Sequence, residues 1–221
     1  MACAQCVGIA QEFDDGMARR ELRSYRRRGP SKTTRMMLGA IRRFGVERAT
    51  FLDVGGGVGV IQHELIEAGA AAGTSVDASP AYLETARAEA ERRGYAARMR
   101  YVLGDFVETS SALDPADVVT LDRVICCYHD MPALVDSAAS RSRRLVGLVF
   151  PRSEKWLVRF GVRLINLVQT LRRRPFRVFA HRAEDVRTRL EHRGFARTFL
   201  GTSFFWQVHV YALGAEGQSP G

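Results

Sequence analysis

A glycine-rich stretch that directly follows a short apolar run restricts the fold more than any other feature of this sequence. The run Thr50–Val54 leads into GGGVG at positions 55–59, and a helical pattern begins at Val60. Glycine is favoured where a chain turns sharply and a ligand lies against bare backbone, as it does at the N-terminus of a helix. The pattern therefore predicts a strand, a tight turn and a helix, with a ligand bound at the turn.

Strands and helices alternate along most of the chain. Strands are expected at Thr50–Val54, Gly73–Val76, Met99–Leu103, Asp117–Leu121, Leu145–Phe150, Phe195–Thr202 and Phe204–Leu213. Helices are expected at Ile9–Arg27, Ser31–Phe44, Val60–Ala68, Pro80–Arg93, Met131–Arg143 and Arg182–Arg193. This alternation predicts an α/β fold with a mostly parallel sheet and helices on both faces. The last two strands are expected to form an antiparallel pair.

The chain of 221 residues is long enough for one domain with an ordinary core. We expect residues 1–45 to form an N-terminal helical lid or cap and residues 46–214 to form the main domain. Residues 154–178 interrupt the strand–helix rhythm and are expected to be an amphipathic helical insertion. The tail, residues 215–221, is expected to be flexible.

Four aspartates follow or end successive predicted strands: Asp53, Asp77, Asp105 and Asp122. In an open α/β sheet such positions lie at the carboxyl edge, where ligands bind. A carboxylate there can accept hydrogen bonds from ribose hydroxyls or from an exocyclic amine, and the ring of Phe106 could lie against a purine. A single aspartate of this kind is most often a helix cap, but four in sequence favour a nucleoside site.

The spacing of the glycines narrows the class of protein. A nicotinamide-binding fingerprint G-x-G-x-x-G would need glycine where Val60 stands. The pattern D-x-G-x-G-x-G at 53–59, with the later aspartates in order, resembles a class I S-adenosylmethionine-dependent methyltransferase over Thr50–Leu213. That resemblance implies a Rossmann-like, seven-stranded, mostly parallel sheet with an antiparallel last strand. The stretch LDRVICCYHD at 121–130 and the insertion after the fifth strand are loosely similar to magnesium-protoporphyrin methyltransferases.

The resemblance also implies a role for each cofactor-binding residue. Gly55, Gly57 and Gly59 would line the methionine part of S-adenosylmethionine, with Asp53 near its amino group, Asp77 on the ribose, Asp105 and Phe106 at the adenine, and Asp122 opening the reaction site. His129, with Asp130 beside it, is the candidate catalytic base, and Tyr128 is the candidate for orienting the acceptor, since methyl transfer needs alignment and sometimes a proton acceptor. The alternative is that His129 only begins the next helix.

The four cysteines form no disulfide framework. Cys3 and Cys6 have the spacing of half a zinc site, but no second pair matches it, so we predict no metal. Cytosine-C5 methyltransferases place a nucleophilic cysteine after the fourth strand, but they have proline before it, where Ile125 precedes Cys126. Buried thiols are therefore the favoured interpretation of this pair.

The net charge of +9 is unevenly distributed. Residues 1–45 carry +6, residues 46–140 carry −8 and residues 141–221 carry +11, and only two of the basic residues are lysines. The arginine-rich flanks are either a solvated surface or a basic rim for an anionic partner. The helix expected within 154–174 is either packed on the domain or a helix that makes peripheral contact with a membrane surface.

We therefore expect methyl transfer to an oxygen, less often a nitrogen, of a small anionic or amphipathic acceptor. Two alternatives are an RNA methyltransferase that uses the basic flanks and a non-catalytic cofactor-binding protein. The motif of enzymes that methylate nucleobase amines is missing after the fourth strand, which argues against that acceptor. The cysteine usage and the lack of a leader pattern favour a cytoplasmic protein.

Overall fold

A central seven-stranded sheet organises the molecule, and the computed structural model describes residues 4–214 of it. The strands are β1 (Thr50–Val54), β2 (Ala72–Asp77), β3 (Met99–Leu103), β4 (Ala116–Asp122), β5 (Ser142–Pro151), β6 (Phe195–Thr202) and β7 (Trp206–Leu213). Their order is β3-β2-β1-β4-β5-β7-β6, and β7 runs antiparallel to both of its neighbours while the other pairings are parallel. This is the Rossmann-like α/β fold with an antiparallel last strand that the sequence predicts.

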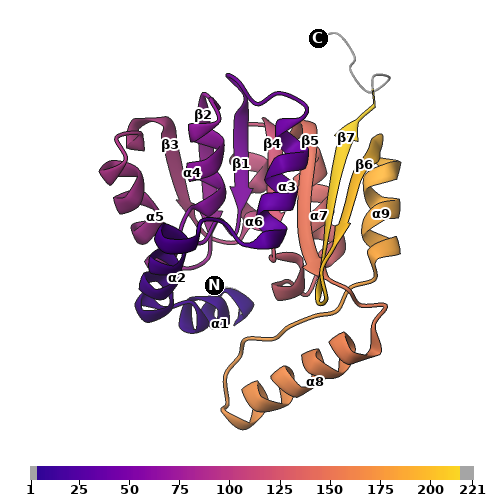
Figure 1. The fold of residues 1–221 in the computed structure, drawn as a ribbon. Coiled ribbons are helices and arrows are strands. Elements are labelled where there is room, and N and C mark those ends of the chain that lie inside the picture. The colour runs from indigo at the N-terminus through magenta and orange to yellow at the C-terminus, as the bar shows by residue number, and fades with distance from the viewer. Residues whose placement is uncertain (1–3, 215–221) are drawn as a thin grey trace.

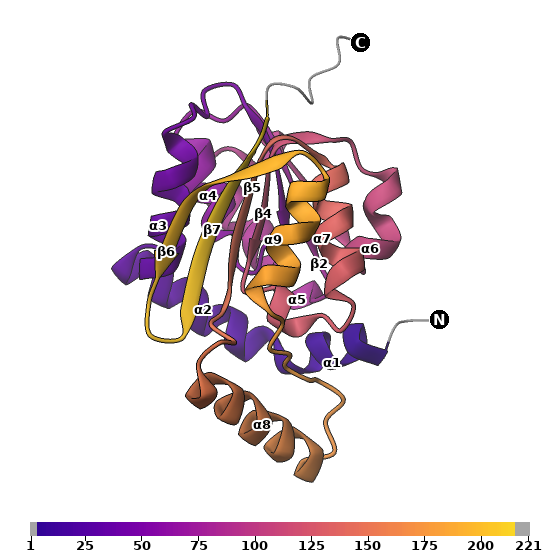
Figure 2. The same cartoon turned by 90° about the vertical axis from the view of Figure 1, so that its right-hand side faces the viewer.

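Helices cover both faces of the sheet (Figures 1 and 2). One face carries α3 (Lys32–Arg42), α4 (Val60–Glu67) and α5 (Pro80–Arg92), and the other carries α6 (Phe106–Thr109), α7 (Met131–Ser140) and α9 (Ala183–His192). Three 3-10 turns, Ala96–Arg98, Ser110–Ala112 and Ile125–Cys127, lie in the connections.

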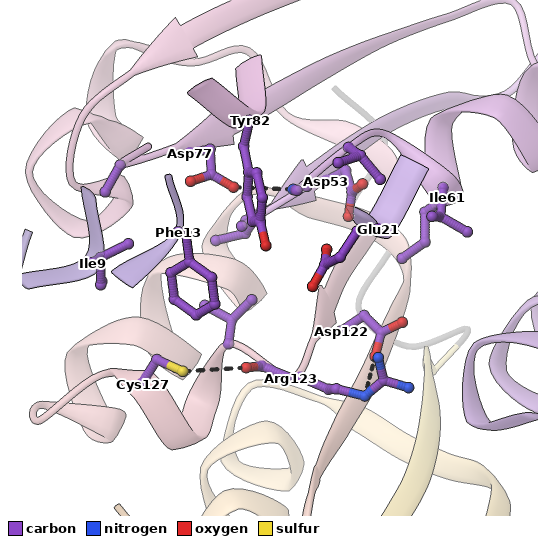
Figure 3. A pocket seen from close by; sticks show the side chains of 18 of the residues that line it. Ile9, Phe13, Glu21, Asp53, Ile61, Asp77, Tyr82, Asp122, Arg123 and Cys127 are labelled. Carbon is purple, nitrogen blue, oxygen red and sulfur yellow. Dashed lines mark hydrogen bonds and ion pairs between the residues drawn. The ribbon is translucent and has the colours of Figure 1, made fainter. Parts of the chain in front are cut away.

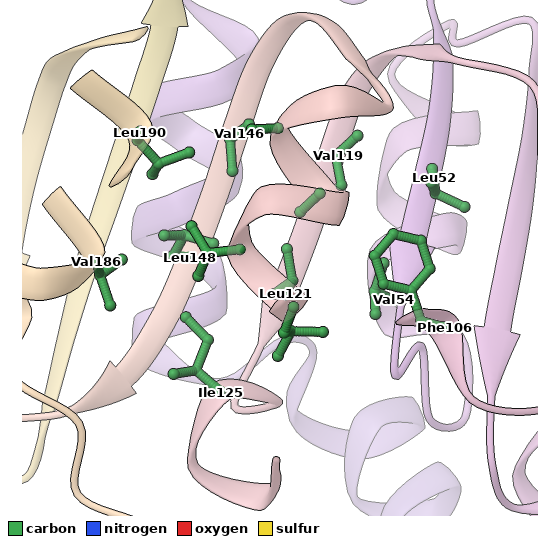
Figure 4. Packing of buried hydrophobic residues seen from close by; sticks show 14 of the residues in the cluster. Leu52, Val54, Phe106, Val119, Leu121, Ile125, Val146, Leu148, Val186 and Leu190 are labelled. Atoms are coloured by element: carbon green, nitrogen blue, oxygen red, sulfur yellow. The ribbon is translucent and has the colours of Figure 1, made fainter. Parts of the chain in front are cut away.

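The core has two halves because each face of the sheet is apolar. Figure 4 shows the half under α7 and α9, where Leu121 and Leu148 of the sheet pack with Val186 and Leu190 of α9. Burying an aliphatic side chain of this size stabilises the fold by about 1.5–3 kcal/mol. Strands buried on both faces are typical of parallel sheets, which explains why their sequences read as continuous apolar runs.

Several boundaries differ from the sequence prediction by one to three residues, and one predicted helix is divided. The helix expected at Ile9–Arg27 is two helices, α1 (Ala4–Glu12) and α2 (Asp15–Arg28), because Asp14 accepts a 2.9 Å hydrogen bond from the Met17 amide and starts a new helix. The helix expected to reach Arg143 ends at Ser140, and the residues from 142 onward begin β5. The strand expected from Phe204 begins at Trp206.

Helices α1 and α2 lie across the carboxyl edge of the sheet (Figure 1). The buried ring of Tyr25 in α2 stacks on the ring of His63 in α4, with centroids 5.5 Å apart. The Tyr25 hydroxyl donates a hydrogen bond to the Glu64 carboxylate. Arg26 forms an ion pair of 2.5 Å with Glu89 of α5. These contacts fix α2 over the ends of the strands, where the site forms. The predicted flexible tail, 215–221, lies outside the described residues.

The insertion after β5 contains one long helix, α8 (Trp156–Leu171), which stands away from the sheet beside α1 (Figure 1). Residues 172–182 return the chain to α9 without regular structure. Asn166 fixes this return, because its side chain both donates to the Val178 carbonyl and accepts from the Val178 amide, each at 2.8 Å. No helix among residues 4–214 has the length and hydropathy needed to cross a bilayer.

Candidate active site

The turn after β1 has the backbone conformation that only glycine adopts easily. Gly55, Gly57 and Gly59 have φ values of +61°, +55° and +83°. A Cβ at Gly55 would lie 2.5 Å from Cγ2 of Val124, so this glycine lets β1 and the segment after β4 approach each other. A Cβ at Gly57 would meet only the Tyr82 ring, at 3.7 Å, and the residue borders open space.

Asp77 ties the glycine turn to the end of β2. Its carboxylate accepts from the Gly57 amide at 3.0 Å and from the Ser79 amide at 2.8 Å. Burial raises the pKa of Asp77 to about 6, although these amides act in the opposite direction. Each oxygen can still accept another hydrogen bond, as the predicted contact with ribose hydroxyls requires.

Asp53 lies beneath the turn and is 1% exposed. Its Oδ1 accepts from the Thr120 hydroxyl at 2.8 Å, while its Oδ2 and the Ser75 hydroxyl have no hydrogen-bond partner. Burial raises the pKa of Asp53 to about 8, the Thr120 bond lowers it, and the nearby Asp122 and Asp77 raise it further. An unpartnered buried carboxylate oxygen beside the cavity suits a cationic ligand group.

Asp105 and Tyr128 contact each other in the wall of the site. The Tyr128 hydroxyl lies 2.9 Å from both carboxylate oxygens of Asp105, whose Oδ1 also accepts from the Val107 amide. Phe106, the first residue of α6, is 5% exposed and lines the cavity. Tyr128, predicted as a catalytic residue, thus contacts the carboxylate predicted for the adenine.

Asp122 and Arg123 form the wall at the end of β4. Asp122 Oδ2 accepts from the Thr34 hydroxyl of α3 at 2.5 Å, and its Oδ1 lies 3.8 Å from Arg123 Nε. Burial raises the pKa of Asp122, while Arg123 and Thr34 oppose that rise. Arg123 has a φ of +65°, and its guanidinium lies over the Trp206 ring at 5.3 Å. Strained φ values in residues other than glycine concentrate at functional sites.

Glu21 is a site residue that the sequence motifs did not indicate. It comes from α2 and lines the cavity near the Tyr82 hydroxyl and the Asp122–Arg123 pair (Figure 3). Its side chain keeps accessible surface, but the protein around it removes enough water to raise its pKa. No sequence motif relates the position of a residue in α2 to the ends of the strands. Only the packing of α2 against the sheet domain brings the Glu21 carboxylate to the site.

These groups surround one cavity of about 570 Å³. The lining combines the polar groups of the glycine turn and the aspartates with apolar side chains from separate elements (Figure 3). The apolar lining includes Ile9, Phe13, Ile165, Val178 and Trp206. The volume falls within the range of small-molecule sites.

His129 is not brought into this cavity. Its side chain is exposed, and its ring stacks on Tyr128 with centroids 5.2 Å apart. Its neighbour Asp130 caps α7 by accepting from the Ala133 amide. The geometry therefore matches the alternative reading of this histidine, which places it at the start of a helix.

The two cysteines after β4 line the cavity as thiols. Their sulfurs lie 3.7 Å apart, and the sulfur of Cys126 lies 3.2 Å from the Arg123 carbonyl. The hydrogen bond with Cys126 and burial raise the pKa of Cys127 well above its ordinary value. A thiol with a raised pKa is a poor nucleophile, so Cys127 agrees with the favoured interpretation.

No cluster of three or more histidine, cysteine or acidic residues arranged for a metal occurs in the part of the chain that the structure describes. Cys3 lies outside that part, and the Cys6 side chain is not described either. The predicted role of this pair stays untested.

The glycine turn and the aspartates around it fit a nucleoside cofactor that carries positive charge. The turn leaves bare backbone beside Gly57, Asp77 has acceptor capacity for hydroxyls, and Asp53 and Asp122 each have one buried oxygen without a hydrogen bond. The amino group and the sulfonium of S-adenosylmethionine are cations. A nearby cation favours the ionised form of a carboxyl group and so lowers a pKa that burial has raised.

Comparison with known proteins agrees with this geometry. Residues 51–145 match the family model described as a methyltransferase domain. Residues 51–145 are therefore a methyltransferase domain, and the chain has the fold of class I S-adenosylmethionine-dependent methyltransferases, with S-adenosylmethionine as the cofactor. No curated protein sequence matches the chain.

Solved structures share the fold at low identity. Magnesium protoporphyrin IX methyltransferase from Synechocystis PCC 6803, with bound S-adenosylhomocysteine, is 21% identical with a TM-score of 0.67, covering 83% of this chain and 82% of that one. An O-methyltransferase family protein from Burkholderia thailandensis is 16% identical with a TM-score of 0.62, covering 81% and 55%. Mitomycin 7-O-methyltransferase is 21% identical with a TM-score of 0.59, covering 87% and 57%.

Proposed function

We propose that this methyltransferase acts in the cytoplasm on an oxygen, less often a nitrogen, of a small anionic or amphipathic acceptor. The observation that carries the proposal is the composition of the cavity lining, which combines the glycine turn and the aspartates with apolar side chains from other elements. The glycine turn and the aspartates are the residues predicted for the cofactor, so we assign the apolar side chains to the acceptor. Two structural neighbours, a magnesium protoporphyrin IX methyltransferase and mitomycin 7-O-methyltransferase, are named for small-molecule acceptors.

Arg123 supports an acceptor with negative charge. Of the described residues that line the cavity, it is the only arginine or lysine. Its guanidinium is positioned by hydrogen bonds to the hydroxyls of Ser31 and Thr33 and by the Trp206 ring. A guanidinium fixed in this way can bind a carboxylate or phosphate of the acceptor with little loss of entropy.

The chain's own contribution to the reaction is alignment and exclusion of water. The cofactor supplies the methyl group on a good leaving group, so the protein has to hold donor and acceptor in line. We propose that the N-terminal helices act as the predicted cap, because Ile9, Phe13 and Glu21 close one side of the cavity. We assign Tyr128 to positioning Asp105, and we assign no proton transfer to the exposed His129.

The proposal is tested first by cofactor affinity. Asp77→Ala should weaken binding of S-adenosylhomocysteine at least about tenfold in titration calorimetry, because a ligand hydrogen bond and the anchor of the glycine turn are both lost. Asp114→Ala, which removes an exposed aspartate distant from the cavity lining, is the matched control and should bind as the parent does. Equal affinity of Asp77→Ala and the parent would show that the site assignment is wrong.

The acceptor is tested by transfer of tritium from labelled cofactor into a fractionated cell extract. We expect label in a small, anionic, organic-extractable product identified by mass spectrometry, and Arg123→Gln should reduce its formation more than it reduces cofactor affinity. Label that sediments with RNA, in an amount that falls steeply with salt, would favour the RNA alternative instead.

A further inference from the structure

The outward face of α8 is apolar and open to solvent. Seven side chains on it are between 37% and 75% exposed: Trp156, Leu157, Phe160, Leu164, Leu167, Val168 and Leu171. With 3.6 residues per turn, they fall within an arc of about 120°. The buried side chains of this helix, Val158 and Gln169, lie on the opposite side. An apolar stripe of this extent on a single helix marks an interaction surface.

Unpaired cations border the stripe. Arg159 and Arg163 lie along one edge of α8, and Arg172 and Arg173 follow its C-terminal end; all four are exposed. Among the described residues, none of these four forms an ion pair, whereas Arg174 pairs with Glu12 at 2.8 Å. The helix itself contains no acidic residue. The charges that border the stripe are therefore positive.

The surface continues onto the hairpin between β6 and β7. Phe204 and Phe205, at its tip, are 56% and 51% exposed, and Lys155 Nζ lies 4.7 Å from the centroid of the Phe204 ring. This contact joins the hairpin to the N-terminal end of α8. We call α8 together with residues 204–205 and the bordering cations the α8 surface.

The α8 surface adjoins the cavity. Ile165, on α8, and Val178, on the return segment that Asn166 fixes, both line the cavity. The helix that carries the stripe therefore also borders the cavity.

Charge decides which occupant fits this surface. A second copy of the chain would bring one set of unpaired arginines against another, which is unfavourable. A bilayer with anionic headgroups offers apolar acyl chains to the stripe and negative charge to its border, as it does for interfacial helices. We infer that the α8 surface binds anionic lipid membranes, and that the acceptor enters the cavity from the lipid. The second clause rests on the proposed function, and the first does not.

The experiment is sedimentation of the full chain with vesicles. Phosphatidylcholine vesicles containing phosphatidylglycerol should bind the protein, with affinity falling as salt rises, and vesicles of phosphatidylcholine alone should bind it at least about tenfold more weakly. Leu164→Glu should reduce binding to the anionic vesicles at least about tenfold, because a charge replaces an exposed leucine that the bilayer would cover. Leu200→Glu is the matched control, since Leu200 on β6 is 52% exposed against 50% for Leu164.

The border is tested by the double variant Arg159→Gln with Arg163→Gln. It should bind anionic vesicles more weakly and with a smaller salt dependence, while Arg43→Gln with Arg100→Gln, which removes two exposed arginines elsewhere, should bind as the parent does. The fluorescence of Trp156, isolated in a Trp206→Phe background, should shift to the blue with anionic vesicles.

Three results would overturn the inference. They are absence of vesicle binding, equal binding by Leu164→Glu and Leu200→Glu, and a stable dimer in light scattering that Leu164→Glu dissociates. Calorimetry with S-adenosylhomocysteine in the absence of vesicles tests the proposed cofactor site independently of the membrane inference. Failure of one can therefore be told from failure of the other. If binding holds but the labelled product of the tritium assay does not partition into vesicles, the route through the lipid is wrong.

Discussion

Two glycines of the turn after β1 have different structural tasks. Gly57 opens toward the cavity, whereas Gly55 makes room for Val124 of the segment after β4. Both have positive φ values, which a residue with a Cβ adopts at a cost of roughly 1–2 kcal/mol. The glycines therefore serve packing as well as ligand binding, although the motif alone suggests only the second.

We expect Gly55→Ala to lower the free energy of unfolding by about 2–4 kcal/mol, because steric overlap with Val124 adds to the cost of the positive φ. Urea titration followed by circular dichroism measures this. Gly39→Ala is the matched control: Gly39 lies inside α3 with no atom within 4 Å of an added Cβ, so this variant should be more stable than the parent by about 0.5–1 kcal/mol. Similar stability of the two variants would contradict the packing role.

The sequence was enough to predict that the four aspartates lie at the carboxyl edge of the sheet. It was not enough to predict which other side chains lie beside them. The order of strands and the rule that ligands bind at carboxyl ends locate Asp53, Asp77, Asp105 and Asp122 at one edge. Glu21 reaches that edge only through the docking of α2, a tertiary contact between segments that no local periodicity encodes. The exposed position of His129 likewise depends on a 3-10 turn, Ile125–Cys127, that carries no clear sequence signal.

Helices and strands were predictable where the apolar periodicity and the capping residues indicate the same boundary. In the N-terminal segment these two signals conflict, because the apolar periodicity continues through Phe13 while Asp14 caps a new helix. The periodicity suggested one helix, and the cap divides it into two. That division lets α1 turn toward the cavity, where Ile9 forms part of the lining.

Replacement of Asp14 should therefore destabilise α2. We expect Asp14→Ala to cost about 1 kcal/mol in urea unfolding, because the Met17 amide loses its acceptor. Asp15→Ala, one residue later and without the capping bond, should cost less. A cost for Asp14→Ala no larger than that of Asp15→Ala would show that the cap does not determine the break.

The Asn166 side chain is the main polar tie between α8 and its return segment. Asn166→Ala removes both hydrogen bonds to Val178, so hydrogen exchange at the Val178 amide should accelerate by about tenfold or more while global stability changes little. Thr170→Ala, which removes only a hydroxyl bonded to the Asn166 carbonyl within the helix, is the control. Unchanged exchange at Val178 would mean that packing alone holds the segment.

Across the whole molecule, buried titratable groups act on stability in opposite directions. Asp53 and Asp77 have pKa values of about 8 and 6 in the folded protein, above the ordinary value of 3.8. The folded state therefore favours their protonated forms, and the free energy of unfolding falls as the pH rises from the ordinary pKa to the folded one. Burial lowers the pKa of His63 and of His209 to about 4, so stability rises with pH between about 4 and 6.5. The two effects offset each other below pH 6.5, and the Asp53 effect remains above it.

We therefore expect the free energy of unfolding of the ligand-free protein to decline between pH 6.5 and 8. Asp53→Asn should remove most of that decline, exceeding the parent in stability by on the order of 1 kcal/mol at pH 8 and by less at pH 5. Asp114→Asn, at an exposed position, should follow the parent at every pH. A constant difference between Asp53→Asn and the parent would show that Asp53 is ionised throughout.

Glu12 joins α1 to α8, two helices that each contribute a residue to the cavity lining. Its carboxylate accepts from Gln169 of α8 at 3.2 Å and pairs with Arg174, so the end of α1 and the end of α8 are held by one side chain. A displacement of α8 would therefore also move α1 and the part of the cavity lining that Ile9 forms.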